Sequence, residues 1–328
     1  MNDMEVTPAL QAELKDLDRS VKTHIDHFKN RIVTGEGCPA IATGFPLLDC
    51  IFDGGLHEGL YIMGALSSMG KTSLMLQMAD QMAARGKDVI IYSLEMARYE
   101  LMAKSVSRLT YIKDKRTKTN AKTARDLLSR HDVYSFQAAE HLDDCIEIYR
   151  EYAEHLYITE GLGEVGAETI GEDIAEFIKK YLRQPPVVIV DYLQILRPSN
   201  PRASDKQNMD TAIFKLKRIS REHGIPIIGI SSFNRSSYTK RAAMEAFKES
   251  GAIEYSSDVL MTMQFKNISD TTKEDDMGQR IKEEKRRDVR EVELEILKNR
   301  NGKTGDRIYY EYRPRYNLFT EKGKAQDE

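Results

Sequence analysis

The stretch Gly59-Leu-Tyr-Ile-Met-Gly-Ala-Leu-Ser-Ser-Met-Gly-Lys-Thr-Ser73 decides the fold. It opens with an apolar run, continues as a short loop of small residues ending in Gly70-Lys71-Thr72, and is followed by a helical pattern over 74–82. This order of strand, loop and helix is typical of a phosphate-binding loop, in which backbone N–H groups and the positive end of a helix dipole face phosphate oxygens. The sequence therefore predicts a nucleotide-binding α/β protein.

Each residue type in this loop has a chemical role. Lys71 is expected to reach the β- and γ-phosphates of the nucleotide, and the Thr72 hydroxyl is expected to coordinate Mg²⁺. The motif usually begins with glycine, whereas this chain has Ala65 there, preceded by Gly64. The predicted nucleotide-binding residues are those of the loop and the first helical turn: Ala65, Ser67, Ser68, Met69, Gly70, Lys71, Thr72 and Ser73.

Two carboxylates follow short apolar runs. Asp191 ends Val187-Val-Ile-Val-Asp191, which is typical of a buried parallel strand, and ligands bind at the carboxyl ends of such strands. We therefore expect Asp191 to hold Mg²⁺ either by direct coordination or by contact with one of the ion's ligands. Glu95 follows Val89-Ile-Ile-Tyr-Ser-Leu94. Its spacing from Lys71 leaves two alternatives open: a group that polarises the attacking water, or a capping or surface residue.

Further along the chain, short apolar runs alternate with helical patterns, as in βαβ units. We predict strands over 59–63, 88–93, 156–159, 187–191, 226–231, 259–265 and 292–297, with a long helical stretch over about 97–183. Residues 198–207 are predicted to form a loop, 270–288 a solvated helix or loop, and the chain after Thr320 a frayed end.

An amphipathic helix is predicted over 9–32. Its apolar residues recur at spacings of three and four and so form one stripe, while charged residues fill the other face. The stripe either covers the helix's own domain or contacts a neighbouring subunit. Its members are Leu10, Leu14, Leu17, Val21, Ile25, Phe28 and Ile32.

Composition excludes several classes of protein. The 328 residues carry 49 Lys and Arg against 52 Asp and Glu, a net charge of −3, so any contact with nucleic acid must come from a local patch. No apolar run approaches the ~18 residues of a membrane helix, and the polar start MNDMEVTP is not a secretory signal. The three cysteines are far apart in the sequence, which favours a reducing compartment over a disulfide framework or a metal site. A cytoplasmic globular protein is expected.

Six short segments occur in a recognisable order: Ser68-Met-Gly-Lys-Thr72, Ser93-Leu-Glu-Met96, Asp191-Tyr-Leu-Gln194, Phe233-Asn-Arg-Ser236, Glu249-Ser-Gly-Ala-Ile-Glu254 and Lys298-Asn-Arg-Asn-Gly302. Together they resemble the RecA-like motor domain of the DnaB family of hexameric replicative helicases, over about 43–319. The resemblance implies an α/β fold, a RecA-like P-loop NTPase with a mostly parallel central sheet flanked by helices. It also divides the chain into a linker helix over 1–35, an ATPase domain over 36–322 and a tail over 323–328.

The resemblance implies ATP and Mg²⁺ as cofactors and a homo-oligomeric ring, a hexamer in the family, as the working assembly. ATP would be hydrolysed at subunit interfaces to drive movement along single-stranded DNA during DNA replication, in the family's 5'-3' direction. By the family's pattern, Glu95 activates water, and Arg300 reaches into a neighbour's site as an arginine finger, with Lys298 as its companion at the γ-phosphate. The alternative for Lys298 and Arg300 is a basic hairpin on a solvated face, with its turn at Gly302 and Gly305.

The segment Lys248-Glu-Ser-Gly251 matches the loop that tracks single-stranded DNA through the central pore of the family's ring. Its lysine would meet phosphate by charge, and its backbone N–H groups would do so without sequence preference. An ordinary solvated basic loop is the alternative. The predicted DNA-binding residues are Arg235, Arg241, Lys248, Glu249, Ser250 and Gly251.

The chain departs from the family's pattern in two places. Ser232, a further candidate for nucleotide contact, occupies the position of the Gln that senses the γ-phosphate, so coupling to the DNA loop would run through Asn234, through water, or be weak. The family's N-terminal helical domain, which engages primase, has no counterpart in this sequence. The chain is therefore expected to be a mobile-element or phage-type helicase, or a piece of a longer primase–helicase. The resemblance allows primase or a helicase loader as a further partner. A membrane is not expected as a partner.

Two other functions stay open. A RadA/KaiC-like ATPase, which acts in recombination or as a nucleotide-dependent scaffold, shares the opening Thr43-Gly-Phe-Pro-Leu-Leu-Asp49 and Gly54-Gly-Leu56. A protein that binds ATP and DNA as an assembly platform, with hydrolysis lost, is supported by Ser232 alone. ATP turnover stimulated by single-stranded DNA would distinguish this platform from the two enzymes.

Overall fold

The computed structural model describes residues 20–34, 40–115, 117–129, 135–161, 163–181, 185–233, 244–247, 251–266 and 274–324. The chain divides into two units, Met1–Pro39 and Ala40–Glu328. In the first unit the described element is helix α2 (Val21–Thr34), which confirms the C-terminal part of the predicted amphipathic helix. The surface that its apolar stripe covers stays a prediction.

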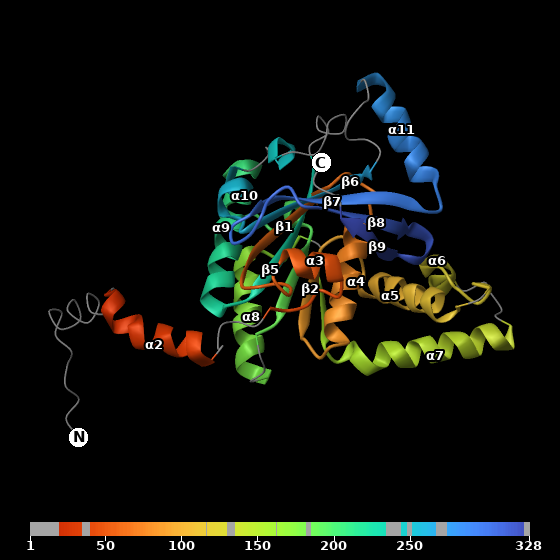
Figure 1. The fold of residues 1–328 in the computed structure, drawn as a ribbon, viewed down its shortest axis with the longest axis horizontal. Helices are drawn as coiled ribbons and strands as arrows, with labels where there is room; N and C mark the ends of the chain where they lie inside the picture. The colour runs from red at the N-terminus through yellow and green to blue at the C-terminus, as the bar shows by residue number, and fades with distance from the viewer. Residues whose placement is uncertain are drawn as a thin grey trace. The chain divides into compact units, whose positions relative to one another are not determined.

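The second unit is built on a sheet that, within the described residues, has nine strands in the order β3-β2-β4-β5-β1-β6-β7-β8-β9 (Figure 1). The first six positions hold parallel strands: β1 (Gly59–Ala65), β2 (Val89–Ser93), β3 (Leu156–Glu160), β4 (Val187–Asp191), β5 (Pro226–Ser232) and β6 (Val259–Phe265). Antiparallel pairing then adds β7 (Arg290–Asn299), β8 (Arg307–Arg313) and β9 (Leu318–Lys324). The expected α/β fold with a mostly parallel sheet is confirmed.

Helices cover both faces of the sheet, because right-handed crossovers that travel in opposite directions along it place their helices on opposite faces. One face carries α4 (Lys71–Ala83), α5 (Arg98–Lys113), α6 (Ala124–Leu128) and α7 (Phe136–Ala153) (Figure 1). The other carries α8 (Ala167–Tyr181), α9 (Asp205–His223) and α10 (Gly251–Ser256). Two more helices are α3 (Pro46–Ile51), before β1, and α11 (Glu274–Arg286), between β6 and β7.

The central strands are buried along their whole length because helices lie on both sides of them. Every residue of β1, β2, β4 and β6 is buried. Their side chains form one core with α4 and α9, in which Leu60, Ile62, Leu74, Val190 and Leu216 are fully enclosed. Each such side chain stabilises the fold by about 2 kcal/mol relative to an exposed position. This core fixes the ends of the strands, where the candidate site lies.

The edge formed by β8 and β9 is not among the predicted strands. β9 continues past Thr320, so the prediction of a frayed end is wrong for residues 321–324. The Glu321 carboxylate accepts hydrogen bonds from Leu47 N at 2.9 Å and from Leu48 N at 3.2 Å. These two bonds anchor the edge strand to the start of α3.

The two polar segments that the sequence marks outside the strands contain helices. α9 begins at Asp205, inside the predicted loop 198–207, where the Ser204 hydroxyl caps its first turn by accepting from Gln207 N. The charged segment 270–288, predicted as a solvated helix or loop, contains α11.

Among the helices that the structure describes, none is both long and apolar enough to cross a membrane. Within the same ranges, no three His, Cys, Asp or Glu side chains gather closely enough to hold a metal ion. Cys50 and Cys145 are free thiols, and Cys38 lies outside the described residues.

Candidate active site

The candidate site lies at the carboxyl end of the parallel sheet, where four neighbouring strands finish together. Strand pairing aligns Ser93 with Asp191 and Ala65 with Ser232. Because β2, β4, β5 and β1 are adjacent, the residues that follow them meet at one edge. The sheet therefore gathers residues that lie far apart in the chain.

The loop between β1 and α4 has a tight local conformation. Ser68 and Gly70 have φ angles of 65° and 92°, in the left-handed region, and α4 begins at Lys71. Successive N–H groups in such a turn form a concave anion site beside the helix N-terminus. Ser67 and Ser68 are exposed, whereas Met69 is fully buried and anchors the loop in the core.

The Lys71 ammonium lies inside this loop. Its Nζ donates to Ala65 O at 3.0 Å, to Leu66 O at 3.4 Å and to Ser232 Oγ at 3.3 Å. Burial lowers the pKa of Lys71 to about 8, although two nearby carboxylates act to raise it. A half-buried cation whose direct partners are neutral oxygens is a ready counter-charge for phosphate.

Thr72 and Asp191 meet beside the loop. Thr72 Oγ1 donates to Asp191 Oδ2 at 2.6 Å. Asp191 is 5% exposed, and burial raises the pKa of its carboxyl while the Thr72 hydrogen bond lowers it. A hydroxyl and a buried carboxylate are hard oxygen donors, a set that fits Mg²⁺. These two residues would hold a Mg²⁺ ion here.

Glu95 follows the end of β2, and its side chain is exposed. Burial is the main cause that raises the pKa values of Asp191 and Tyr192, and the Glu95 charge raises both further. The first turn of α5 is capped by Glu100, whose carboxylate accepts from Ala97 N at 2.9 Å, so Glu95 is not needed for that role. Glu95 is thus an exposed carboxylate whose charge acts on Asp191, one of the two residues that would hold the metal.

The backbone of Ser232 is held by the side-chain amide of Gln194. Gln194 Nε2 donates to Ser231 Oγ at 3.0 Å and to Ser232 O at 3.2 Å. In return, Ser232 N donates to Gln194 Oε1 at 3.4 Å. The amide that contacts Ser232 therefore comes from the segment after β4, and Asn234 lies outside the described residues.

Lys104 on α5 is a cation of the site that the sequence analysis does not single out. Its Nζ donates to Asn317 Oδ1 at 3.1 Å, and Ser73 Oγ donates to the same oxygen at 3.0 Å. Burial lowers the pKa of Lys104, while Asp191 and Glu95 are among the carboxylates that raise it. No spacing in the sequence marks Lys104, because it reaches the site through its contact with Asn317, more than 200 residues away in the chain. Because the Ser73 hydroxyl is hydrogen-bonded to Asn317, Ser73 would contact a nucleotide through its backbone N–H only.

Residues near the C-terminus close the site from the side. Arg290 Nη1 donates to Ser68 O at 3.0 Å. The Tyr312 ring lies against Gly70, where a Cβ atom would come within 2.6 Å of the ring's Cζ. Tyr312 in turn stacks on Phe319, with ring centroids 4.1 Å apart. The antiparallel strands thus form a wall beside the phosphate loop.

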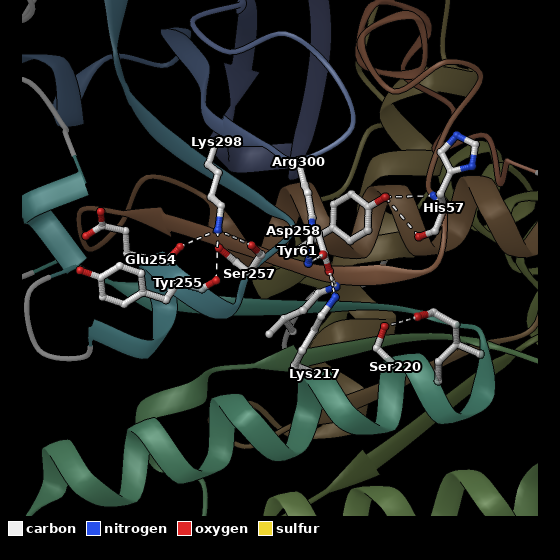
Figure 2. A network of polar contacts seen from close by, with 12 residues as sticks. His57, Tyr61, Lys217, Ser220, Glu254, Tyr255, Ser257, Asp258, Lys298 and Arg300 are labelled. Carbon is white, nitrogen blue, oxygen red and sulfur yellow. Dashed lines mark hydrogen bonds and ion pairs between the residues drawn. The ribbon is translucent and has the colours of Figure 1, made fainter. Parts of the chain in front are cut away.

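Lys298 and Arg300, at the end of β7, are turned to their own chain, as Figure 2 shows. Arg300 Nη1 lies 3.5 Å from Asp258 Oδ1, and the Arg300 side chain is 63% exposed. In the described residues, neither cation contacts the phosphate loop of its own chain. The Lys298 ammonium donates to three backbone oxygens at the end of α10, those of Glu254 (2.6 Å), Ser257 (2.7 Å) and Tyr255 (3.4 Å).

The predicted DNA-contacting segment is described at one residue. Gly251 is exposed and begins α10. DNA contact here stays a prediction, because the other candidates lie outside the described residues: Arg235, Arg241, Lys248, Glu249 and Ser250.

A phosphate loop between strand and helix, with a lysine, a threonine and a strand-end aspartate around it, defines a P-loop nucleotide-binding domain with RecA-like topology. Residues 40–321 match the model of the family described as DnaB-like helicase C terminal domain. The chain belongs to this family.

Replicative helicases are among the relatives that match. Replicative DNA helicase DnaB of Helicobacter pylori is 28% identical over 293 residues, which cover 81% of this chain and 56% of that protein. The protein of the same name from Geobacillus stearothermophilus is 26% identical over 326 residues, 96% of this chain and 63% of its own length. The chain thus spans less than two thirds of these relatives.

Two solved structures share the fold. The first is an ATPase domain, which superposes with a TM-score of 0.74 at 22% identity, over 93% of this chain and 99% of that chain. The second is a DnaB-like replicative helicase, whose structure was described together with its interactions with primase. It gives a TM-score of 0.73 at 21% identity, over 92% of this chain and 66% of that chain.

Proposed function

We propose that this chain is the ATP-hydrolysing motor part of a DNA helicase that acts in DNA replication. The observation that carries the proposal is the convergence of Lys71, Thr72 and Asp191 at one sheet edge, with the exposed Glu95 beside them. The matching relatives are replicative DNA helicases, which supports this function over a recombination ATPase or a nucleotide-dependent scaffold.

The residues present suit ATP hydrolysis. Lys71 would exchange its carbonyl contacts for β- and γ-phosphate oxygens. Mg²⁺, when held by Thr72 and Asp191, would neutralise charge on the phosphates. Glu95 would orient and polarise the attacking water. Arg300 of a neighbouring copy would stabilise charge in the transition state, an effect worth about 10³–10⁵ in rate for such a cation.

A homo-oligomeric ring, six copies by family resemblance, follows from the incompleteness of the site in one chain. Arg300 is exposed and does not contact its own phosphate loop in the described residues, so a second copy would supply it. Single-stranded DNA would pass the segment 248–251 in the pore, moving 5'-3' by family resemblance. Residues 1–35 would link neighbouring motor domains over 36–322, in the cytoplasm, and a primase or a loader would bind the assembled ring.

Steady-state ATP turnover with and without single-stranded DNA, beside light scattering for mass, tests the proposal. DNA-stimulated turnover from a multi-subunit species is the expected result. Glu95→Gln should keep nucleotide affinity and lose turnover, because it removes the carboxylate that polarises water and leaves Lys71, Thr72 and Asp191 in place. Turnover in the ring that ignores DNA, or a Glu95→Gln variant that hydrolyses ATP normally, would contradict the proposal.

A further inference from the structure

Lys298 caps a helix of its own subunit. α10 has six residues, so the carbonyls at its C-terminal end find few partners inside the helix and favour a nearby cation. An ammonium has three N–H donors, and Figure 2 shows three hydrogen bonds from the Lys298 nitrogen to backbone oxygens at that end of α10. All three donors of the Lys298 ammonium are therefore engaged by α10 and the residue that follows it.

The same strand end is tied to the body of the sheet through Asp258. Arg300 N donates to Asp258 O at 2.8 Å. The Asp258 carboxylate accepts from Leu60 N at 2.7 Å and forms an ion pair with Lys217 of α9 (Figure 2). A displacement at the end of β7 is therefore transmitted to β1 and α9 as well as to α10.

We propose that Lys298 is a positioning residue for α10 in its own subunit. When the Lys298 ammonium binds the nucleotide of the neighbouring copy, it releases the carbonyls of α10. The inference rests on the proposed function, since it takes Lys298 to accompany the finger Arg300. With all three donors at α10, the same nitrogen cannot contact a phosphate at the same time. Lys298 therefore either caps α10 or contacts ATP in the neighbouring site.

This alternation links two sites in the ring. α10 begins at Gly251, where the predicted DNA-contacting segment ends. When ATP binds in one subunit, Lys298 of the adjacent subunit moves to it and leaves α10 of its own subunit. That helix loses its cap, and the contact of its subunit with DNA changes. Nucleotide binding in one subunit is thus coupled to the DNA contact of the next.

Hydrogen exchange tests the cap directly. Lys298→Met keeps the length of the side chain and removes its donors, so the amides of residues 252–257 should exchange about fivefold faster than in the wild-type protein. Arg300→Ala is the matched control, because it removes a cation from the same strand end without touching the carbonyls of α10. Its exchange over 252–257 should equal that of the wild type. Wild-type exchange in Lys298→Met would overturn the proposal.

Nucleotide tests the alternation in the assembled protein. AMP-PNP with Mg²⁺ should raise exchange over 252–257 in the wild type towards the Lys298→Met level and leave that variant unchanged. Without nucleotide, Lys298→Met should bind a single-stranded oligonucleotide more weakly than Arg300→Ala does. A ring that hydrolyses ATP but shows no nucleotide effect on α10 would overturn the alternation. If the wild type neither hydrolyses ATP nor binds DNA, the proposed function fails, while the exchange rates of the two variants still decide the cap.

Amine labelling of the wild-type protein decides the same point if Lys298→Met does not fold. Lys303, in the turn between β7 and β8, is exposed and should react readily with acetic anhydride. Lys298 should be protected in the nucleotide-free protein, because its ammonium is held by three carbonyls. A Lys298 that reacts as fast as Lys303 would overturn the cap.

Discussion

The Lys71 ammonium has no negatively charged group among its hydrogen-bond partners. The oxygens around it are two backbone carbonyls and the Ser232 hydroxyl, none of which carries a charge. Neutral partners compensate only part of the cost of burying an ammonium, so the pKa of Lys71 falls to about 8. A phosphate supplies the missing negative charge and restores the protonated form.

Nucleotide affinity should therefore fall as pH rises above about 8. The free protein loses the Lys71 proton through this range while the phosphate-bound protein keeps it, so affinity weakens by up to about tenfold per pH unit. Titration calorimetry with ADP, in buffers with different ionisation heats, measures both the affinity and the proton uptake. Lys71→Arg stays charged and should show no such trend. A flat profile in the wild type would contradict the prediction.

Lys104→Met should reduce ATP turnover by about a hundredfold, with a smaller effect on ADP affinity, because it removes a fixed cation from the place where charge develops in the transition state. Lys104 Nζ and Ser73 Oγ share Asn317 Oδ1, which places this cation beside the first turn of α4. Burial lowers the pKa of Lys104, and the carboxylates that oppose this shift include Asp191 and Glu95. Turnover and ADP binding are measured for Lys104→Met and for Lys104→Arg. The arginine variant keeps the charge and should retain most of the turnover; an equal loss in both would point to packing instead.

Some residues of the site could be predicted from the sequence and others could not, and the reason is physical. Thr72 and Asp191 each belong to a local pattern, one at a helix start and one at a strand end, and the sheet brings such positions together. Lys104 and Asn317 enter the site because α5 and the turn after β8 both pack on α4. That packing is long-range, so no spacing in the sequence indicates it.

Elements of the sheet were predictable according to how they are stabilised. Five of the six parallel strands are buried apolar runs, because helices cover both of their faces, whereas β3 is half-buried; each of the six predicted ranges overlaps the observed strand. β8 alternates Ile308, Tyr310 and Tyr312, all buried, with partly exposed residues in a short charged stretch. β9 has two buried side chains, Leu318 and Phe319, and depends on backbone hydrogen bonds to β8 that leave no hydrophobic pattern.

The wall of antiparallel strands predicts different costs for two glycine substitutions. Gly70 and Gly305 both have positive φ angles, 92° and 86°, which cost a non-glycine residue about 1–2 kcal/mol. At Gly305 a Cβ atom meets nothing within 4 Å, whereas at Gly70 it meets the Tyr312 ring. Displacing the ring adds about 2 kcal/mol, so Gly70→Ala should cost about 3–4 kcal/mol in urea unfolding. Equal losses for the two variants would mean that the ring moves aside freely.

At the scale of the whole molecule, the proposed site is divided between copies. Lys71→Ala and Arg300→Ala should each abolish turnover, and Arg300→Ala should still bind nucleotide, because its own phosphate loop is intact. Mixing the two inactive variants should restore activity, since Lys71 of one copy and Arg300 of its neighbour complete an interface. In an equal random mixture about a quarter of the interfaces are complete. No recovery in mixed rings would contradict the assignment of Arg300 to the neighbouring site.

The wall of C-terminal strands beside the phosphate loop also has a consequence for synthesis on the ribosome. The loop is translated before Arg290, Tyr312 and Phe319, which close and support it and lie about 220–250 residues further along the chain. At about 5–20 residues per second, the interval between them is roughly ten to fifty seconds. A nascent chain therefore has no complete nucleotide pocket until β8 and β9 emerge, and before that point ATP has only part of its site to bind.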